Sequence, residues 1–182
     1  MSLEQAFNAG QTLADFLESS GEHAPLWQAV MRRTVVADDV VAAVSELGGR
    51  WHLLVLLEDW CGDAVNSVPV IARLAEFAPN LELRVLSRDA YPELMTTHLS
   101  PSGGRAIPVV ILLDDAFVEQ GWWGSRPRAL QQWIDAQGAA LGKEDRYLAA
   151  RRWYVADRGA STAREIAELV TAAAHVRAAP SC

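Results

Sequence analysis

Cysteine is scarce in this chain of 182 residues, which contains only Cys61 and Cys182. Two cysteines in a chain of this length exclude a small scaffold held together by several disulfides. Long apolar runs are also missing, and none approaches the roughly 20 residues that a membrane-spanning helix needs. The first residues lack the basic start and the apolar core of a signal peptide. From these absences we expect a cytoplasmic protein with no membrane partner.

Positive charge is in deficit, since the formal net charge is −7. This balance argues against nucleic acid or an anionic membrane as the partner. The four histidines, His23, His52, His98 and His175, show no mutual spacing typical of metal ligands, so we expect neither a metal site nor a bound cofactor. What is present, 51% apolar and 21% charged residues, is the composition of an ordinary globular protein with a sizeable core.

The first of three segments, residues 1–50, is predicted to be a helical N-terminal extension. Ser2–Gln5 has the form of a capping box, in which two side chains bond to backbone N–H groups at the start of a helix. Pro25 suits the start of a second helix, and Asp38 or Asp39 is expected to cap a third.

The middle segment, residues 51–140, alternates short apolar runs with helical patterns. Strands are predicted at 52–57, 81–86, 109–113 and 117–123. Helices are predicted at 63–77, 92–99 and 127–141. This alternation predicts an α/β sandwich around a mixed sheet.

The last segment, residues 141–182, is predicted to be a helical C-terminal extension. Thr162–Glu165 has the form of another capping box, and apolar residues follow it at helical spacing. The sequence contains no internal repeat and no low-complexity linker. We therefore expect the helices at both ends to pack on the central sheet in a single domain, 1–182.

The most informative residue is Cys61, which lies between the apolar run that ends at Leu57 and the helical pattern that follows. A thiol at the start of a helix meets free backbone N–H groups and the positive end of the helix dipole, both of which stabilise a thiolate. Ala64 stands where a dithiol redox protein carries its second cysteine. Cys61 therefore cannot close a Cys-x-x-Cys disulfide.

Trp60-Cys61-Gly62 precedes the helical pattern, and Pro69 lies within it, eight residues after Cys61. The first three residues resemble the start of the active-site motif of the thioredoxin family, and Pro69 resembles the proline inside that family's active-site helix. Ile107-Pro108 resembles the segment whose proline takes the cis form, and Gly121 fits a glycine late in the fold. The resemblance covers residues 50–140. It implies a thioredoxin-like three-layer α/β sandwich with a mixed central sheet, extended here by helices at both termini.

The resemblance also implies a role for each matching residue. Cys61 would be the nucleophile in thiol–disulfide exchange, flanked by Trp60, Gly62 and Asp63. The backbone of Ile107 and Pro108 would offer an edge on which an extended peptide or a thiol ligand pairs. The partners expected are a protein or small-molecule disulfide, and glutathione or another low-molecular-weight thiol that releases the mixed disulfide.

Several positions depart from the family pattern. Ala64 removes the resolving thiol, and Val55 stands where thioredoxins usually carry a buried aspartate. Asp63 replaces the usual proline, and Val109 replaces a common threonine. These changes make the chain an atypical monothiol member, for which the standard disulfide-reductase cycle is not available.

The charge around Cys61 leads to an expectation for its reactivity. The helix start lowers the pKa of the thiol from its free value of about 8.5. Glu58, Asp59 and Asp63 add negative charge within three residues, which favours the neutral thiol. Because the two effects oppose each other, we expect a modestly depressed pKa and a thiol open to disulfides and peroxides.

Three alternatives stay open at this point. Cys61 could be a relic in a binding scaffold that keeps only the fold, as Val55 and Ala64 suggest. It could share an iron–sulfur cluster or a metal with an external thiol, although the Cys-Gly-Phe-Ser pattern of monothiol glutaredoxins is missing. It could act with a histidine, or with Cys182 as a resolving thiol. The sequence does not fix the oligomeric state.

Overall fold

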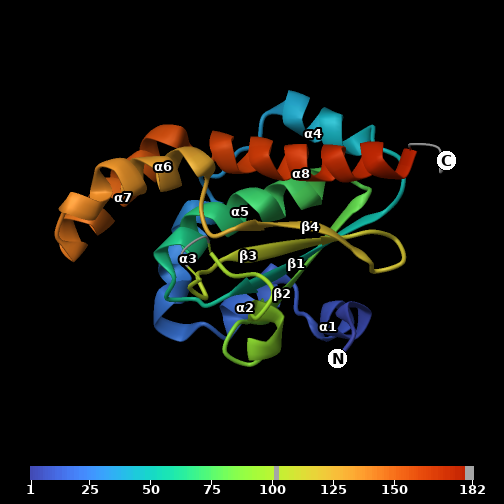
Figure 1. The fold of residues 1–182 in the computed structure, drawn as a ribbon, viewed down its shortest axis with the longest axis horizontal. Coiled ribbons are helices and arrows are strands. Elements are labelled where there is room, and N and C mark those ends of the chain that lie inside the picture. Colours follow the sequence, from blue (N-terminus) through green and yellow to red (C-terminus); the bar gives the residue numbers. More distant parts are fainter. Residues whose placement is uncertain (101–102, 179–182) are drawn as a thin grey trace.

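A four-stranded sheet forms the centre of the molecule in the computed structural model, which describes residues 1–100 and 103–178 (Figure 1). Its strands run in the spatial order β2-β1-β3-β4. Their bounds are β1 Trp51–Leu57, β2 Leu81–Ser87, β3 Val109–Leu113 and β4 Glu119–Gly124. β1 pairs with β2 in parallel, whereas β3 is antiparallel to both β1 and β4. The predicted mixed sheet is confirmed.

The apolar sequence of β1 reflects its central place in the sheet. All seven of its residues are buried, because strands flank it on both sides and helices cover both faces. Trp51 and Val55 point to one face, and His52 points to the other, where its ring stacks on Phe117. Val55 pairs with Val85 on one side and with Val110 on the other.

Helices complete the layers above and below the sheet (Figure 1). On one face lie α5 (Gly62–Phe77) and α8 (Ala160–Ala178), and α4 (Asp38–Ser45) packs on α8. On the other face lie α1 (Leu3–Ala9) and α2 (Leu13–Glu18). The remaining helices are α3 (Ala24–Met31), α6 (Arg128–Ala136) and α7 (Lys143–Asp157), with 3-10 turns at Gly21–His23, Pro92–Met95 and Gly138–Ala140. This arrangement confirms the predicted three-layer fold with extra helices at both ends.

Both terminal segments contribute to the hydrophobic core. Phe7 and Trp27 from the N-terminal helices are buried in the same cluster as Ile166 and Val170 from α8. Gln11 also forms an antiparallel bridge to Val85 at the outer edge of β2, with two backbone hydrogen bonds of 2.9 Å. Among the helices of the described residues, none is long and apolar enough to cross a bilayer.

Two expectations for the N-terminal helices have different outcomes. The capping box at the start of α1 is confirmed, since the Ser2 hydroxyl accepts from the Gln5 N–H and the Gln5 side chain accepts from the Ser2 N–H. The expectation for α4 is wrong, because Ala37 is its N-cap and makes no side-chain cap. Asp38 and Asp39 instead occupy the first turn, where their charge favours the helix dipole.

The predicted capping box at Thr162–Glu165 is also wrong. α8 begins two residues earlier, at Ala160, and the Thr162 side chain is fully buried inside it. The break between α7 and α8 is made by Arg158, which has a left-handed conformation, and by Gly159. A Cβ on Gly159 would overlap the Val70 side chain, so packing against α5 fixes the position of this break.

Other predicted helix boundaries also differ from those in the structure. Pro127 is the N-cap of α6, one residue before the helix, and the helix ends at Ala136 instead of continuing to about Leu141. The segment from Pro92 forms only a 3-10 turn as far as Met95. Asp114 makes the predicted turn before β4, where its carboxylate accepts from the N–H groups of Ala116 and Val118.

Glu165 ties α8 to the edge of the sheet. Its buried carboxylate accepts from the indole N–H of Trp123 at 2.7 Å and from the backbone N–H of Arg128 at 2.9 Å. Glu165→Ala leaves both donors without this acceptor, so we expect it to lower the free energy of unfolding by about 2–4 kcal/mol. Chemical denaturation measures the change.

Glu168 provides the matched control, since it lies on the same helix and pairs with the same Arg128 at the surface. Glu168→Ala should cost less than about 1 kcal/mol, as is usual for exposed ion pairs. Equal losses in the two variants would contradict the role given to Glu165.

Candidate functional site

Cys61 is the N-cap of α5 and lies shortly after Leu57, the last residue of β1. Its backbone is extended, with φ −78° and ψ 114°, and its N–H donates to the Glu58 carbonyl at 3.1 Å. The helix then begins at Gly62, and Pro69 lies inside it. This is the strand-to-helix position that the sequence predicts for Cys61. Only 8% of the residue is exposed to solvent.

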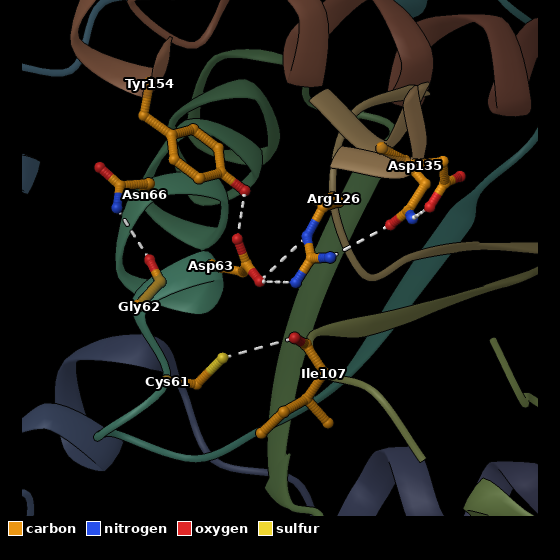
Figure 2. Close-up of polar contacts among 9 residues, drawn as sticks. Cys61, Gly62, Asp63, Asn66, Ile107, Arg126, Asp135 and Tyr154 are labelled. Atoms are coloured by element: carbon orange, nitrogen blue, oxygen red, sulfur yellow. Dashed lines mark hydrogen bonds and ion pairs between the residues drawn. The ribbon is translucent and has the colours of Figure 1, made fainter. Parts of the chain in front are cut away.

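The segment before β3 covers the thiol. The Sγ atom of Cys61 donates to the carbonyl oxygen of Ile107 at 3.4 Å, across 46 residues of sequence (Figure 2). The Ile107–Pro108 peptide bond is cis. The structure therefore brings Cys61, Ile107 and Pro108 together, as the resemblance implies.

Gly124, at the end of β4, permits this arrangement. A Cβ at position 124 would overlap the carbonyl oxygen of Pro108. Gly121, which fits the glycine that the family carries late in the fold, instead faces the Leu169 side chain of α8, 3.1 Å from where its Cβ would lie. The glycine that the Pro108 carbonyl requires is therefore Gly124, three residues after Gly121.

Burial raises the pKa of the Cys61 thiol above its ordinary value. The backbone N–H groups of Ala64 and Asp63 act in the opposite direction, as expected at a helix start, but they do not outweigh burial. The expected modest depression of the pKa is therefore wrong. The sequence shows the helix start but does not show that Ile107 closes over the sulfur.

Only one of the three nearby acids acts on Cys61 as expected. The charge of Asp63 raises the pKa of the thiol, after burial the main cause of the increase. Glu58 turns toward the end of β2, where its carboxylate accepts from the Ser87 hydroxyl at 2.8 Å and from the Asp89 N–H at 2.9 Å. The backbone carbonyl of Asp59 accepts from the Trp27 indole at 2.9 Å. These two residues hold the loop before Cys61 in place.

Asp63 is also the centre of a polar cluster that we call the Asp63 network, formed by Asp63, Arg126 and Tyr154 (Figure 2). Oδ2 of Asp63 accepts from two nitrogens of Arg126, and Oδ1 accepts from the Tyr154 hydroxyl at 2.9 Å. Gln131 accepts a further bond from Arg126 at 3.1 Å. Both oxygens of Asp63 are thus engaged by donors, and the side chain is held in place in the first turn of the helix that Cys61 caps.

Arg126 and Tyr154 were missed by the sequence interpretation. They lie 63 and 91 residues from Asp63, on the connection after β4 and on α7. Burial and the charge of Asp63 raise the pKa of Tyr154 well above its ordinary value, so its hydroxyl keeps its proton and donates. The one local signal was an acid at position 63, where the family carries proline.

Trp60 and Gly62, the predicted site residues on either side of Cys61, contact other side chains. Trp60 is 54% exposed, and the guanidinium of Arg88 lies 5.3 Å from the centre of its ring. The carbonyl of Gly62 accepts from the Asn66 side chain at 2.8 Å, and the position of a Cβ on Gly62 is 3.5 Å from the Tyr147 ring. α7 therefore approaches the start of α5 on this side.

Val55 is fully buried in β1, so no carboxylate occupies the position where thioredoxins usually have one. His52 bonds to the backbone of Asp114, and His98 bonds to Glu119 at 3.0 Å. Within 1–100 and 103–178 no group of three or more His, Cys, Asp or Glu residues could hold a metal ion. Cys182, considered above as a resolving thiol, lies outside the described residues.

A pH profile of Cys61 alkylation tests the effect of burial. With a raised pKa, the rate with iodoacetamide should climb through a midpoint above that of the same cysteine in the unfolded chain. The raised pKa also links the free energy of unfolding to pH, because the native state favours the neutral thiol. The contribution of Cys61 to the free energy of unfolding is fully present below the pKa of the unfolded chain. It is lost as the pH rises through the pKa of the folded protein. A midpoint below that of the unfolded chain would contradict the assignment.

Comparisons with known proteins agree with this fold. A family model described as thioredoxin matches residues 10–140. A protein of unknown function from Pseudomonas aeruginosa has a similar structure, with a TM-score of 0.76 and 20% identity over 95% of this chain and 99% of that one. An HIV epitope scaffold is similar at a TM-score of 0.72 and 19% identity, over 94% and 99% of the two chains. These two likenesses concern the fold. No curated protein matches the sequence.

Proposed function

Because the chain belongs to the thioredoxin family, we propose that it carries out thiol–disulfide exchange through the single thiol of Cys61. The observation that carries the proposal is the contact between Sγ of Cys61 and the carbonyl of Ile107, beside Pro108 and at the start of α5. Cys61 makes no side-chain cap hydrogen bond to α5, but the first backbone N–H groups of the helix still lie close enough to affect its pKa. Those of Ala64 and Asp63 lower the pKa of the thiol and are suited to hold a thiolate.

The reaction takes two exchange steps. The Cys61 thiolate attacks one sulfur of a disulfide R–S–S–R′, which forms a Cys61–S–S–R mixed disulfide and releases R′–S⁻. An external thiolate, from glutathione or another low-molecular-weight thiol, then attacks the mixed disulfide. This second step regenerates the Cys61 thiolate and yields a disulfide between R and the external thiol. No second cysteine in the motif is required.

Substrate binding must uncover the sulfur before the first step. In the resting state the thiol proton lies on Sγ and is donated to the Ile107 carbonyl. An extended substrate that pairs with the backbone at Ile107 and Pro108 competes for this carbonyl and frees the thiol to ionise. The exposed face of Trp60 is available beside it for apolar contact. Reactivity is then coupled to binding, and the thiol of the resting protein reacts slowly.

Mixed-disulfide formation tests the proposal. Treatment with oxidised glutathione should add one glutathionyl group at Cys61, detected by intact mass and peptide mapping, and reduced glutathione should remove it. Cys61→Ser should abolish this adduct completely, whereas the matched variant Cys182→Ser should retain it. Reduction of a small disulfide in the presence of glutathione should follow the same pattern.

The proposal fails if Cys61→Ser retains the adduct and Cys182→Ser loses it. It also fails if no adduct forms on Cys61 of the native protein while the unfolded chain reacts normally. The second result would show that Cys61 is accessible only after unfolding.

A binding scaffold without catalysis is the second candidate. The burial of Cys61, at 8% exposed, and its raised pKa favour this function because both oppose thiolate chemistry in the resting state. A scaffold binds its partner equally well with cysteine or serine at this position, so partner capture by wild type and by Cys61→Ser distinguishes the two functions. Capture that survives reducing agent and the substitution supports the scaffold, and capture as a mixed disulfide supports exchange.

A further inference from the structure

Behind the Asp63 network lies a hollow of about 630 Å³. Its walls come from the connection between α3 and α4, from α5, from the end of α7 and from the start of α8. The volume lies within the range of about 300–1,000 Å³ that is usual for small-molecule sites. We call it the arginine hollow because Arg33, Arg158 and Arg164 line it.

The charge of the arginine hollow is of one sign. Its lining contains three arginines and no aspartate or glutamate, although acids outnumber bases in the chain. None of the three arginines forms an ion pair with a described residue, in contrast to Arg126, Arg128 and Arg177, which each pair with an acid. Arg33 donates one hydrogen bond to the Ala29 carbonyl at 3.0 Å, and the rest of its guanidinium has no acid partner in the described part of the chain.

The remainder of the lining is largely aliphatic. Val70 and Ala163 are buried at its inner side. Val35 and Val155 are 76% and 74% exposed at its outer side, an unusual exposure for two valines that line one hollow. An apolar ligand group that covers these two side chains would remove their surface from water and gain free energy in proportion to that area.

From these observations we propose that the arginine hollow binds a small amphiphilic anion, an alkyl chain that carries one carboxylate or phosphate. The guanidinium groups match either head group through charge-assisted hydrogen bonds. The valine and alanine side chains match the alkyl chain. A cation of the same shape is disfavoured by three arginines that form no ion pair with a described residue.

The arginine hollow shares a wall with the thiol site. Tyr154 and Asn66 line the hollow, and they also bond to Asp63 and to the Gly62 carbonyl (Figure 2). Cys61 itself is not part of the lining, so binding does not depend on thiol chemistry. The proposal can therefore be tested in the Cys61→Ser protein as well as in wild type.

Calorimetric titration with three ten-carbon probes tests the site, each below its micelle-forming concentration. Decanoate and decyl phosphate should be compared with decyltrimethylammonium. We expect one saturable site for at least one anion and none for the cation, and the tighter anion identifies the head group as carboxylate or phosphate. Arg33→Glu or Arg164→Glu should weaken binding by about tenfold or more, since each removes a charge-assisted contact and adds repulsion.

Arg152→Glu is the matched control, because Arg152 is an exposed arginine of α7 outside the lining and should leave affinity unchanged. Chemical-shift changes at the Val70 and Ala163 amides of the wild-type protein provide a readout that needs no variant. The proposal is overturned if neither anion saturates, if the cation binds as tightly, if neither glutamate variant weakens binding, or if these two amides do not shift.

Discussion

Gly124→Ala should lower the free energy of unfolding by about 3 kcal/mol and expose Cys61 to alkylation. The new Cβ would overlap the carbonyl oxygen of Pro108, which is a backbone atom and cannot rotate away as a side chain could. Overpacking of this kind usually costs about 1–3 kcal/mol, and a backbone obstacle belongs at the upper end. Because Ile107 precedes Pro108, its carbonyl should move from Sγ and the iodoacetamide rate of the native protein should increase. Urea denaturation and the alkylation rate measure the two effects.

Gly48→Ala is the control for this substitution. Gly48 is exposed after α4, and a Cβ there meets no atom of the described chain within 4 Å. It should change the free energy of unfolding by less than about 0.5 kcal/mol and leave the alkylation rate unchanged. A Gly124→Ala protein as stable and as slowly alkylated as Gly48→Ala would show that the close approach to Pro108 is not required.

Asp63→Asn is expected to increase the rate of Cys61 alkylation near neutral pH severalfold, since a lower pKa of the thiol raises its thiolate fraction while the pH lies below that pKa. The Asp63 charge raises the pKa of the thiol, and the Arg126 charge lowers it. The substitution removes the first charge and leaves the second without its partner, so both changes lower the pKa. Asparagine keeps an oxygen that can accept from Tyr154, which preserves the local packing.

The reverse charge change gives the opposite result. Arg126→Gln removes the cation and leaves Asp63 unneutralised, so the pKa of Cys61 should increase and alkylation at the same pH should slow. Asp59→Asn serves as the control, since Asp59 is as near in sequence but contributes its backbone carbonyl to Trp27. A change of the same sign in the Asp63 and Arg126 variants would rule out an electrostatic effect and point to loosened structure.

The features that the sequence predicted are those encoded locally. The apolar run at 51–57 identified the central strand, and the Ser2–Gln5 capping box marked the start of α1. Pro69 and Ile107-Pro108 placed Cys61 in a fold with a known connectivity, which the sheet order confirms. The prediction for Thr162–Glu165 failed because a capping-box pattern also occurs inside helices. There, Glu165 has a tertiary partner in Trp123.

The sequence by itself determined that one thiol stands at a strand-to-helix junction without a second cysteine in its motif. Only the tertiary structure decided how that thiol behaves. Ile107 buries the sulfur, Arg126 and Tyr154 engage the nearest acid, and Gly124 gives the Pro108 carbonyl its space. Each of these partners lies far from Cys61 along the chain, and the nearest, Ile107, is 46 residues away. Burial and charge pairing depend on distances in space, so they set the pKa of Cys61 in a way that its sequence neighbours cannot show.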